Sequence, residues 1–164
     1  MIFLFSTLLL LGGCQSAASP SGQLQPARDL SATARAAAQK AIPIVVMFEA
    51  RWCEFCHILR EEVLDPMADN RQDYEGQIAF FRRISIDSDT PLVDFDGHTT
   101  THRTLGERYE IDVTPTVLIF DPAGRVLKRI VGLPGGTVET YSDTLFAAIE
   151  EATEKLRKGM NPHE

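Results

Sequence analysis

The hydrophobic positions of the chain form two kinds of pattern, short continuous runs and longer segments with helical spacing. Runs rich in β-branched residues at 42–48 and 78–86 each predict a buried strand. Two further runs, 116–120 and 125–131, are separated by the turn sequence at 121–124, Asp-Pro-Ala-Gly. This arrangement predicts a strand, turn and strand hairpin near the end of the chain.

Four segments carry helical signals, and a fifth carries the signal of a small extra strand. The predicted helices are 28–41, 57–76, 104–109 and 141–157. We expect the second helix to be interrupted near Pro66, because proline cannot donate a backbone hydrogen bond. The third begins with Thr104-Leu105-Gly106-Glu107, which has the form of a capping box. Residues 92–97 predict a short strand and turn.

The chain has 164 residues, of which 44% are hydrophobic, so it can bury one ordinary core. We therefore expect one folded domain, at 28–164, with an extra helix at its N-terminal end.

The first thirteen residues, 1–13, are apolar and uncharged, and Cys14 follows them. The run is too short for a spanning helix of roughly 20 residues but fits the apolar part of a secretory signal. Its end, Leu-Gly-Gly-Cys, resembles a bacterial lipobox, in which the cysteine is acylated and becomes the new N-terminus. Cleavage after 16–18, Ser-Ala-Ala, is the alternative and would remove Cys14. Residues 14–27 are rich in Ser, Ala and Pro, which predicts a flexible tether.

The formal net charge is −7, and the Lys and Arg residues form no basic run. Neutralising the phosphate backbone of a nucleic acid requires clustered basic residues. Nucleic acid is therefore not an expected partner.

The stretch Trp52-Cys53-Glu54-Phe55-Cys56-His57 allows two interpretations, because CxxCH attaches haem and a CxxC after Trp marks thiol-disulfide sites. A c-type haem protein would need His57 as proximal ligand and a distal ligand such as Met67 or Met160. However, a buried strand runs directly into the motif and a helix follows it. That position favours the thiolate form of Cys53, and Cys56, one turn further on, can resolve a mixed disulfide.

Two other uses of the cysteine pair are less well supported. A zinc site needs about four ligands, and one CxxC supplies two. A purely structural disulfide is expected in an oxidising compartment, but a bridge that closes so small a loop constrains the unfolded chain little. The sequence therefore favours a redox-active pair.

The order of strand, WCxxC, amphipathic helix, strand, and then 113–116 (Val-Thr-Pro-Thr) before a hairpin and last helix resembles the thioredoxin superfamily. The resemblance covers roughly 41–156. It implies an α/β fold with a central mixed sheet flanked by helices, a cis bond before Pro115, and substrate binding by Thr114 and Pro115. Trp52 is expected to shield the site. The resemblance implies no bound cofactor. From the residues alone, Pro115 could also be an ordinary edge-strand proline.

Two departures from that family matter. The family's buried Asp, which accepts a proton from the second cysteine, is replaced here by Met47. Glu49 lies two residues further on and on the same strand face, so it could accept this proton. Alternatively, Glu49 is an exposed residue near Arg51. The stretch between the second strand and Pro115 is longer than in a short thioredoxin and carries His98 and His102. Two histidines without further ligands are a weak metal signal, so we expect both to be exposed loop residues.

The motifs 48–57 (FEARWCEFCH) and 94–97 (DFDG), together with the lipobox, are most similar to periplasmic thioredoxin-like lipoproteins associated with sulfur oxidation. The resemblance implies a lipid-anchored protein, weakly favoured at the outer membrane, that acts on disulfide-containing exported proteins and receives electrons from a membrane donor. Glu54 beside Cys53 opposes thiolate formation, which favours a reductase. A disulfide oxidase or isomerase and a non-catalytic binding module on the same scaffold are the alternatives.

Overall fold

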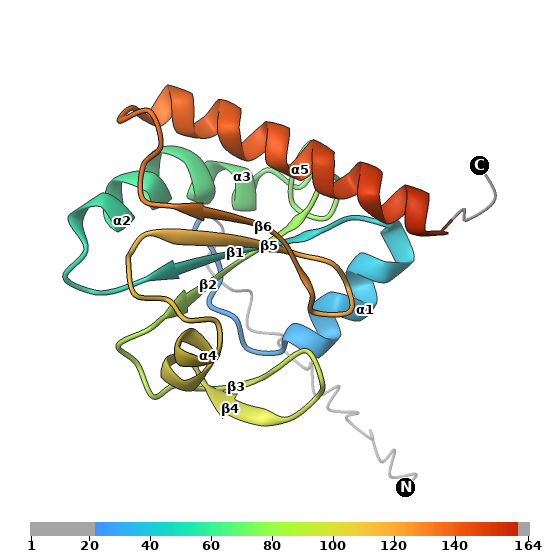
Figure 1. Ribbon diagram of the computed structural model, residues 1–164, viewed down its shortest axis with the longest axis horizontal. Helices are drawn as coiled ribbons and strands as arrows, with labels where there is room; N and C mark the ends of the chain where they lie inside the picture. Colours follow the sequence, from blue (N-terminus) through green and yellow to red (C-terminus); the bar gives the residue numbers. More distant parts are fainter. Residues whose placement is uncertain (1–21, 161–164) are drawn as a thin grey trace, which may run out of the picture.

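The centre of the molecule is a four-stranded mixed sheet with helices on both faces (Figure 1). The structure is a computed structural model that describes residues 22–160. The strands are β1 (Ile44–Glu49), β2 (Phe80–Ser85), β5 (Thr116–Phe120) and β6 (Val126–Val131), in the spatial order β2-β1-β5-β6. Strand β1 is parallel to β2 and antiparallel to β5, and β6 pairs antiparallel with β5. The predicted α/β fold with a central mixed sheet and flanking helices is confirmed.

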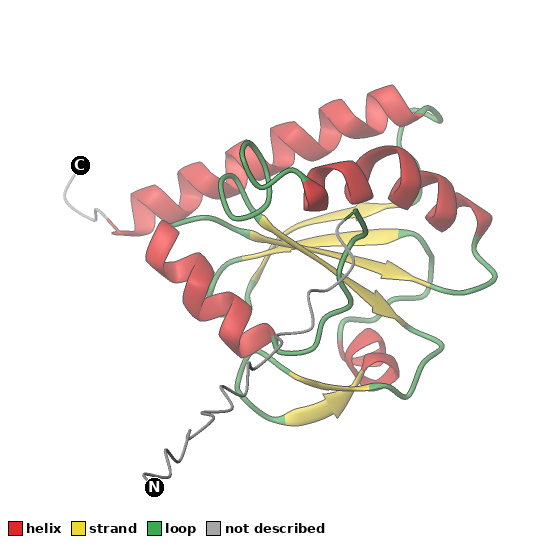
Figure 2. Ribbon diagram, turned by 180° about the vertical axis from the view of Figure 1, so that it is seen from behind, coloured by secondary structure: helices red, strands yellow, loops and turns green. Residues whose placement is uncertain are grey.

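The helices and a small second sheet cover the two faces of this central sheet. They are α1 (Leu30–Lys40), α2 (Glu54–Leu59), the π-helical turn η1 (Arg60–Leu64), α3 (Asp65–Asp69), β3 (Pro91–Val93), β4 (Thr99–Thr101), α4 (His102–Arg108) and α5 (Val138–Met160). Helices α2, α3 and α5 lie on one face, and α1, α4 and the β3–β4 hairpin lie on the other (Figures 1 and 2). No helix within 22–160 is long and apolar enough to cross a membrane.

Strand β1 is buried along its whole length because both of its faces are covered. Val45 and Met47 pack under α2 and α5, whereas Val46 and Phe48 pack toward α1 and α4. This period-2 alternation fixes which face each side chain reaches. Glu49, at the end of β1, therefore continues the row of Val45 and Met47.

The helical segment after the cysteines runs without a gap from residue 54 to 69, but its hydrogen-bond pattern changes inside η1. The Asp65 N–H bonds to the Arg60 carbonyl, five residues back. The regular helix is thus interrupted near Pro66, as predicted, by an irregular turn that ends just before the proline. Pro66 itself occupies the first turn of α3, where the wider turn ahead of it accommodates a residue without an N–H.

The segment just before α1 is packed on the domain. Leu24 and Ala27 are each 1% exposed, and backbone hydrogen bonds join Gln25 and Ala27 to Arg83 on the outer edge of β2. These residues lie in the segment for which we predicted a flexible tether, so the packed part of the chain begins before residue 28. The predicted signal at 1–13, the lipidation residue Cys14 and the tether up to residue 21 lie outside the described residues.

Two local predictions in the insertion before Pro115 were wrong. Helix α4 begins at His102 and not at Thr104, because Thr101 caps it by accepting a hydrogen bond from the Thr104 N–H over 3.2 Å. His102 is buried and not an exposed loop residue, since Nδ1 accepts from the Ser85 N–H at 3.0 Å and Nε2 contacts the Ala27 carbonyl at 3.0 Å. His98 is exposed, as predicted.

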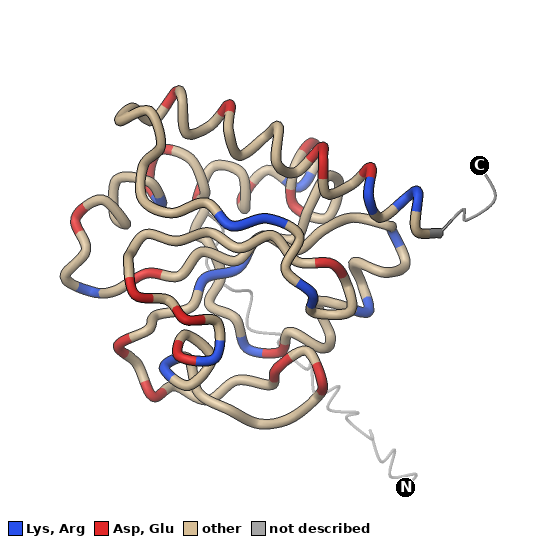
Figure 3. Tube along the Cα trace, in the orientation of Figure 1, with Lys and Arg blue, Asp and Glu red and all other residues tan. Residues whose placement is uncertain are grey.

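Figure 3 shows acidic and basic residues interspersed along the described chain. The acidic residues outnumber the basic ones, 23 to 16, over the full sequence.

Candidate active site

The cysteine pair lies where β1 passes into α2, at one end of the sheet (Figure 1). Ala50, Arg51 and Trp52 connect the strand to Cys53, which is the N-cap residue of α2. Cys53 and Cys56 form a disulfide with their Cα atoms 5.2 Å apart. The strand-to-helix position predicted from the sequence is confirmed.

The sulfur of Cys53 lies over the open end of the helix. Its Sγ accepts a hydrogen bond from the Cys56 N–H over 3.2 Å, and the Cys53 carbonyl accepts one from the His57 N–H over 3.3 Å. A helix start carries unpaired N–H groups and partial positive charge, both of which stabilise an anion. The position therefore favours negative charge on this sulfur after reduction.

The two cysteines differ in exposure, and the segments that form the site carry exposed apolar side chains. Cys53 is 8% exposed and Cys56 is 1% exposed, so a reaction partner reaches Cys53 first. Trp52, Phe55 and Val113 are exposed large hydrophobic residues, at 72%, 60% and 51%. Exposed apolar groups of this size are typical of interaction sites.

Pro115 lies immediately before β5, and the Thr114–Pro115 peptide bond is cis, as the resemblance implied. Thr116, the next residue, pairs with Phe48 at the end of β1, so this loop lies beside the strand that leads to Cys53. The Thr116 hydroxyl donates to the Val113 carbonyl over 2.7 Å and holds the turn. Because β5 lies between β1 and β6, the reading of Pro115 as an edge-strand proline was wrong.

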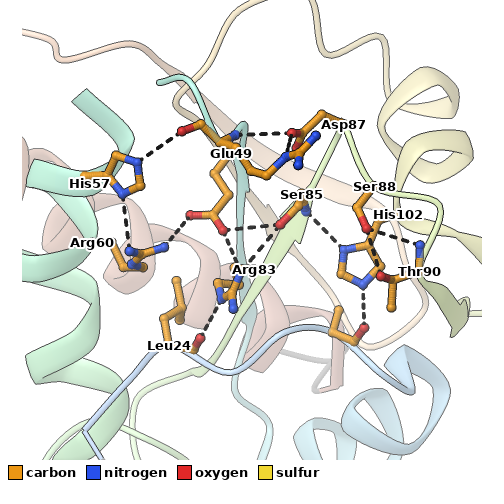
Figure 4. A network of polar contacts seen from close by, with 12 residues as sticks. Leu24, Glu49, His57, Arg60, Arg83, Ser85, Asp87, Ser88, Thr90 and His102 are labelled. Carbon is orange, nitrogen blue, oxygen red and sulfur yellow. Dashed lines mark hydrogen bonds and ion pairs between the residues drawn. The ribbon is translucent and has the colours of Figure 1, made fainter. Parts of the chain in front are cut away.

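Glu49 is buried and lies at the centre of a polar network (Figure 4). Its Oε2 accepts from Arg60 Nη1 over 3.1 Å, and its Oε1 accepts from Arg83 Nη1 over 2.7 Å and from the Ser85 hydroxyl over 3.3 Å. The alternative that placed Glu49 at the surface near Arg51 was wrong. Glu49 is thus a buried carboxylate on the sheet face that also carries the cysteines.

Arg51 pairs instead with Asp87, which follows the end of β2 (Figure 4). Its guanidinium Nε donates to Asp87 Oδ2 over 2.6 Å. Burial alone would raise the pKa of Asp87, but hydrogen bonds from the Arg51 side chain and backbone hold this pKa below its usual value. The ion pair joins the loop before Cys53 to the neighbouring strand, a contact that sequence spacing did not indicate.

His57 is exposed, and both of its ring nitrogens contact protein groups. Its Nε2 contacts the Arg51 carbonyl at 3.3 Å, and its Nδ1 contacts Arg60 Nη2 at 3.3 Å. Both ring nitrogens are therefore engaged, while a haem ligand must offer one of them to iron. Together with the Cys53–Cys56 disulfide, this favours the thiol-disulfide interpretation of the CxxCH motif.

The insertion brings Asp94, Asp96 and His98 together, with one ligand atom of each within 4.8 Å of the others. Asp94 is already engaged, since Oδ1 accepts from the backbone of Asp96 and His98 and Oδ2 accepts from Arg108. Hydrogen bonds from Arg108 and these N–H groups outweigh burial and hold the pKa of Asp94 below its usual value. The group closes a loop, and His102 is not part of it.

Comparison with known proteins agrees with this geometry. A family model described as a thioredoxin-like domain matches residues 30–147. Thioredoxin f from spinach chloroplast, in its short form, has a similar structure, with a TM-score of 0.54 and 18% identity over 82% of this chain and 97% of that one. Thioredoxin f2 from Chlamydomonas reinhardtii gives a TM-score of 0.50 and 18% identity over 77% and 94%. At such identities the likeness shows the fold alone. No curated protein matches the chain in sequence.

The fold and the Cys53–Cys56 disulfide at a helix start together support a thiol-disulfide oxidoreductase in the general sense.

Proposed function

The chain belongs to the family of thioredoxin-like domains, and from this premise we propose that it is a protein-disulfide reductase that works through Cys53 and Cys56. The observation that carries the thiol-disulfide exchange is the hydrogen bond from the Cys56 N–H to the Cys53 sulfur at the helix start. This bond holds the more exposed sulfur where negative charge is stabilised. Because Cys53 is the more exposed cysteine, we expect it to be the nucleophile and Cys56 to be the resolving thiol.

In the reaction we propose, the Cys53 thiolate attacks one sulfur of a client disulfide. A mixed disulfide forms between Cys53 and the client, and the other client sulfur leaves as a thiolate. Cys56 then loses its proton and attacks the Cys53 sulfur, which releases the second client thiolate and closes the Cys53–Cys56 disulfide. Two electrons pass from the protein dithiol to the client, whose thiolates take up protons. A dithiol donor must reduce the pair again before the next cycle.

Three residues around the pair would hold the client segment. Thr114 and Pro115 lie beside the end of β1, and Trp52 precedes Cys53. We propose that the Thr114 backbone pairs with an extended client segment while Trp52 shields the reacting sulfurs. The exposed Phe55 and Val113 extend this surface with apolar area.

Glu49 is our candidate for the acceptor of the Cys56 proton. It is a buried carboxylate on the same sheet face as Met47, which packs in one core with both cysteines. Both of its oxygens already accept hydrogen bonds, so taking a proton would weaken a contact with Arg60, Arg83 or Ser85. The role is testable, because loss of the Glu49 carboxylate should affect the formation and the release of the mixed disulfide differently.

The reductive direction is proposed from the surroundings of Cys53. Glu54, the first residue of α2, is exposed and adds a negative charge next to the nucleophile. A less stabilised thiolate makes the dithiol easier to oxidise, and hence a better reductant.

The second candidate function is a binding module that holds a partner without any reaction. The exposed apolar side chains Trp52, Phe55 and Val113 would suit such a module as well.

We further propose that acylation at Cys14 anchors the protein on the periplasmic side of a membrane, with the outer membrane weakly favoured. Its clients would be exported proteins that carry disulfides. Its electrons would come from a membrane donor that passes reducing equivalents outward. These proposals rest on the sequence pattern around Cys14.

Two measurements test the proposed function. The reduced protein, mixed with a disulfide-linked peptide, should release peptide thiols, and Cys53→Ser should abolish the release. With Cys56→Ser a mixed disulfide through Cys53 should accumulate, whereas a pure binding module would associate with partners unchanged and form none. Equilibration with glutathione gives the direction: a potential more negative than about −200 mV supports a reductase, and one near about −120 mV would make the protein an oxidase.

A further inference from the structure

A chain of polar contacts passes through Glu49 and ends on the loop that carries Cys53 (Figure 4). Arg83 donates to Glu49, and Glu49 also accepts from Arg60. The same Arg60 guanidinium contacts His57 Nδ1 at 3.3 Å, and His57 Nε2 contacts the Arg51 carbonyl at 3.3 Å. The buried carboxylate is thus joined, through two side chains of the helical segment, to the backbone just before the nucleophile.

The contacts of His57 indicate which ring tautomer can join its two partners. A guanidinium can only donate, so Nδ1 must be the acceptor toward Arg60, and a carbonyl can only accept, so Nε2 must carry the hydrogen toward Arg51. The neutral imidazole with its hydrogen on Nε2 satisfies both partners. In this tautomer His57 bridges the Arg60 guanidinium and the Arg51 carbonyl.

The charges of the network are balanced. Arg60 lies between Glu49 at 3.1 Å and Asp65 at 3.8 Å, and Arg83 is 2.7 Å from Glu49. Two carboxylates thus face two guanidinium groups. Their side chains are largely buried, with Arg60 at 22% and Glu49 at 7% exposed, so loss of one partner is not simply screened by water.

The loop before Cys53 is held from two sides. On the side of β2, Asp87 accepts from the Arg51 backbone N–H at 3.4 Å and from its side chain at 2.6 Å. On the side of α2, His57 holds the Arg51 carbonyl. The position of this loop sets where the Cys53 sulfur lies relative to the Cys56 N–H, which is 3.2 Å away.

We infer that His57 and Arg60 are positioning residues for the thiol-disulfide exchange. They fix the loop so that the Cys53 sulfur keeps its hydrogen bond from the Cys56 N–H, and the two side chains themselves contact neither sulfur through any hydrogen bond in the described chain. This inference rests on the proposed function. It assigns to the histidine of the CxxCH motif a role that needs neither metal nor proton transfer.

The test compares His57→Ala with His57→Gln in the reduced full-length protein. His57→Ala removes both contacts, so the Cys53 thiolate should lose part of its hydrogen bond. The rate of iodoacetamide alkylation of Cys53 at pH 7 should fall roughly three- to tenfold, and its pH profile should move to higher pH. The equilibrium with glutathione should shift toward the disulfide by a similar factor. A glutamine can accept from Arg60 and donate to the Arg51 carbonyl, so His57→Gln should recover most of the effect.

His98→Ala is the matched control, because His98 is exposed and lies in the insertion away from the network. It should leave the alkylation profile and the glutathione equilibrium unchanged. If His57→Ala has the wild-type profile and equilibrium, with or without lower thermal stability, the inference is overturned.

A second variant separates geometry from charge. Arg60→Lys keeps the cation but loses the planar fork that contacts Glu49 and His57 together, so it should resemble His57→Ala. Arg60→Gln, which also unbalances the network, should slow alkylation further. Equal profiles for both Arg60 variants and the wild type would contradict the inference. Failure of the proposed function would look different, since the wild-type protein itself would then not exchange disulfides.

Discussion

The Cys56 backbone N–H points at the Cys53 sulfur over 3.2 Å, so the second cysteine of the pair supplies a hydrogen bond to the first. The first turn of α2 thereby gives the two sulfurs different reactivities. Cys53 sits at the open helix end with a donor aimed at it, while Cys56 is 1% exposed and lies within the core. The two thiols should therefore react in a fixed order.

In the reduced protein, Cys53 should react with iodoacetamide faster than Cys56 by on the order of tenfold or more at pH 7. Accessibility and the helix-end hydrogen bond both favour Cys53. Mass spectrometry of peptides after short labelling times measures both rates. Labelling in denaturant is the control, since the two rates should become similar once the helix is lost. Equal rates in the folded protein would contradict the assigned roles.

Glu49→Gln should separate the two chemical steps. If Glu49 accepts the Cys56 proton, the variant should form the mixed disulfide at the wild-type rate or faster but release it on the order of tenfold or more slowly. Rapid-quench analysis of a single turnover with a labelled disulfide peptide measures both steps.

Glu62→Gln is the control for this experiment, because Glu62 is an exposed residue of the same helical segment. It should change neither rate. An unaltered release step in Glu49→Gln would remove Glu49 from the proton path and leave it as the centre of the arginine network.

The parts of the site that could be predicted are those whose signal is local in the sequence. A β-branched run followed directly by Trp52 and Cys53 places the nucleophile at a strand-to-helix junction, and the Val-Thr-Pro-Thr stretch places Pro115 before the next strand. Each inference needs fewer than about ten neighbouring residues. The existence of α1 and α5 followed from periodicity, but their ends did not: the predicted ranges 28–41 and 141–157 differ from the observed Leu30–Lys40 and Val138–Met160.

The parts that were missed depend on partners distant in sequence. Glu49 is neutralised by Arg60, 11 residues away, and Arg83, 34 residues away, and nothing in the spacing indicates these pairs. His102 is buried because Ala27, 75 residues earlier, accepts from its ring. Periodicity shows which face of an element is apolar, but it does not show which polar groups meet when elements pack.

Cys14→Ser should release the protein from the membrane into the soluble periplasmic fraction. The physical reason is that an acyl chain contributes about 0.8 kcal/mol per buried methylene group, and the substitution removes the thiol that would carry it. Fractionation of cells that produce each form, followed by immunoblotting, measures the effect. Cys56→Ser serves as the control and should stay membrane-bound. Identical fractionation of Cys14→Ser and the unaltered protein would count against a lipid anchor.

The buried His102 should make the stability of the protein fall as the pH drops below 6.5. Burial lowers the pKa of His102 from its usual 6.5, and the nearby Arg83 guanidinium lowers it too, although the Ala27 carbonyl and Glu49 act in the opposite direction. The unfolded chain therefore binds a proton more readily than the folded one. The contribution of His102 is complete above pH 6.5 and is lost as the pH falls from 6.5 toward the lowered pKa.

Urea unfolding at a series of pH values from 7.5 to about 4.5 measures this effect, with a slope of at most about 1.4 kcal/mol per pH unit from one group. His102→Asn cannot titrate, so it should be less stable at pH 7.5, by roughly 1 to 3 kcal/mol for the hydrogen bonds it loses, and should show a smaller pH slope. His98→Ala, which removes an exposed histidine, should keep the full slope. Asp87 and Asp94 do not confuse the result, because their pKa values lie below the usual 3.8 and their contributions are lost only at lower pH. Parallel curves of unfolding free energy against pH for His102→Asn and the unaltered protein would contradict this prediction, because they would show that His102 contributes nothing to the pH dependence.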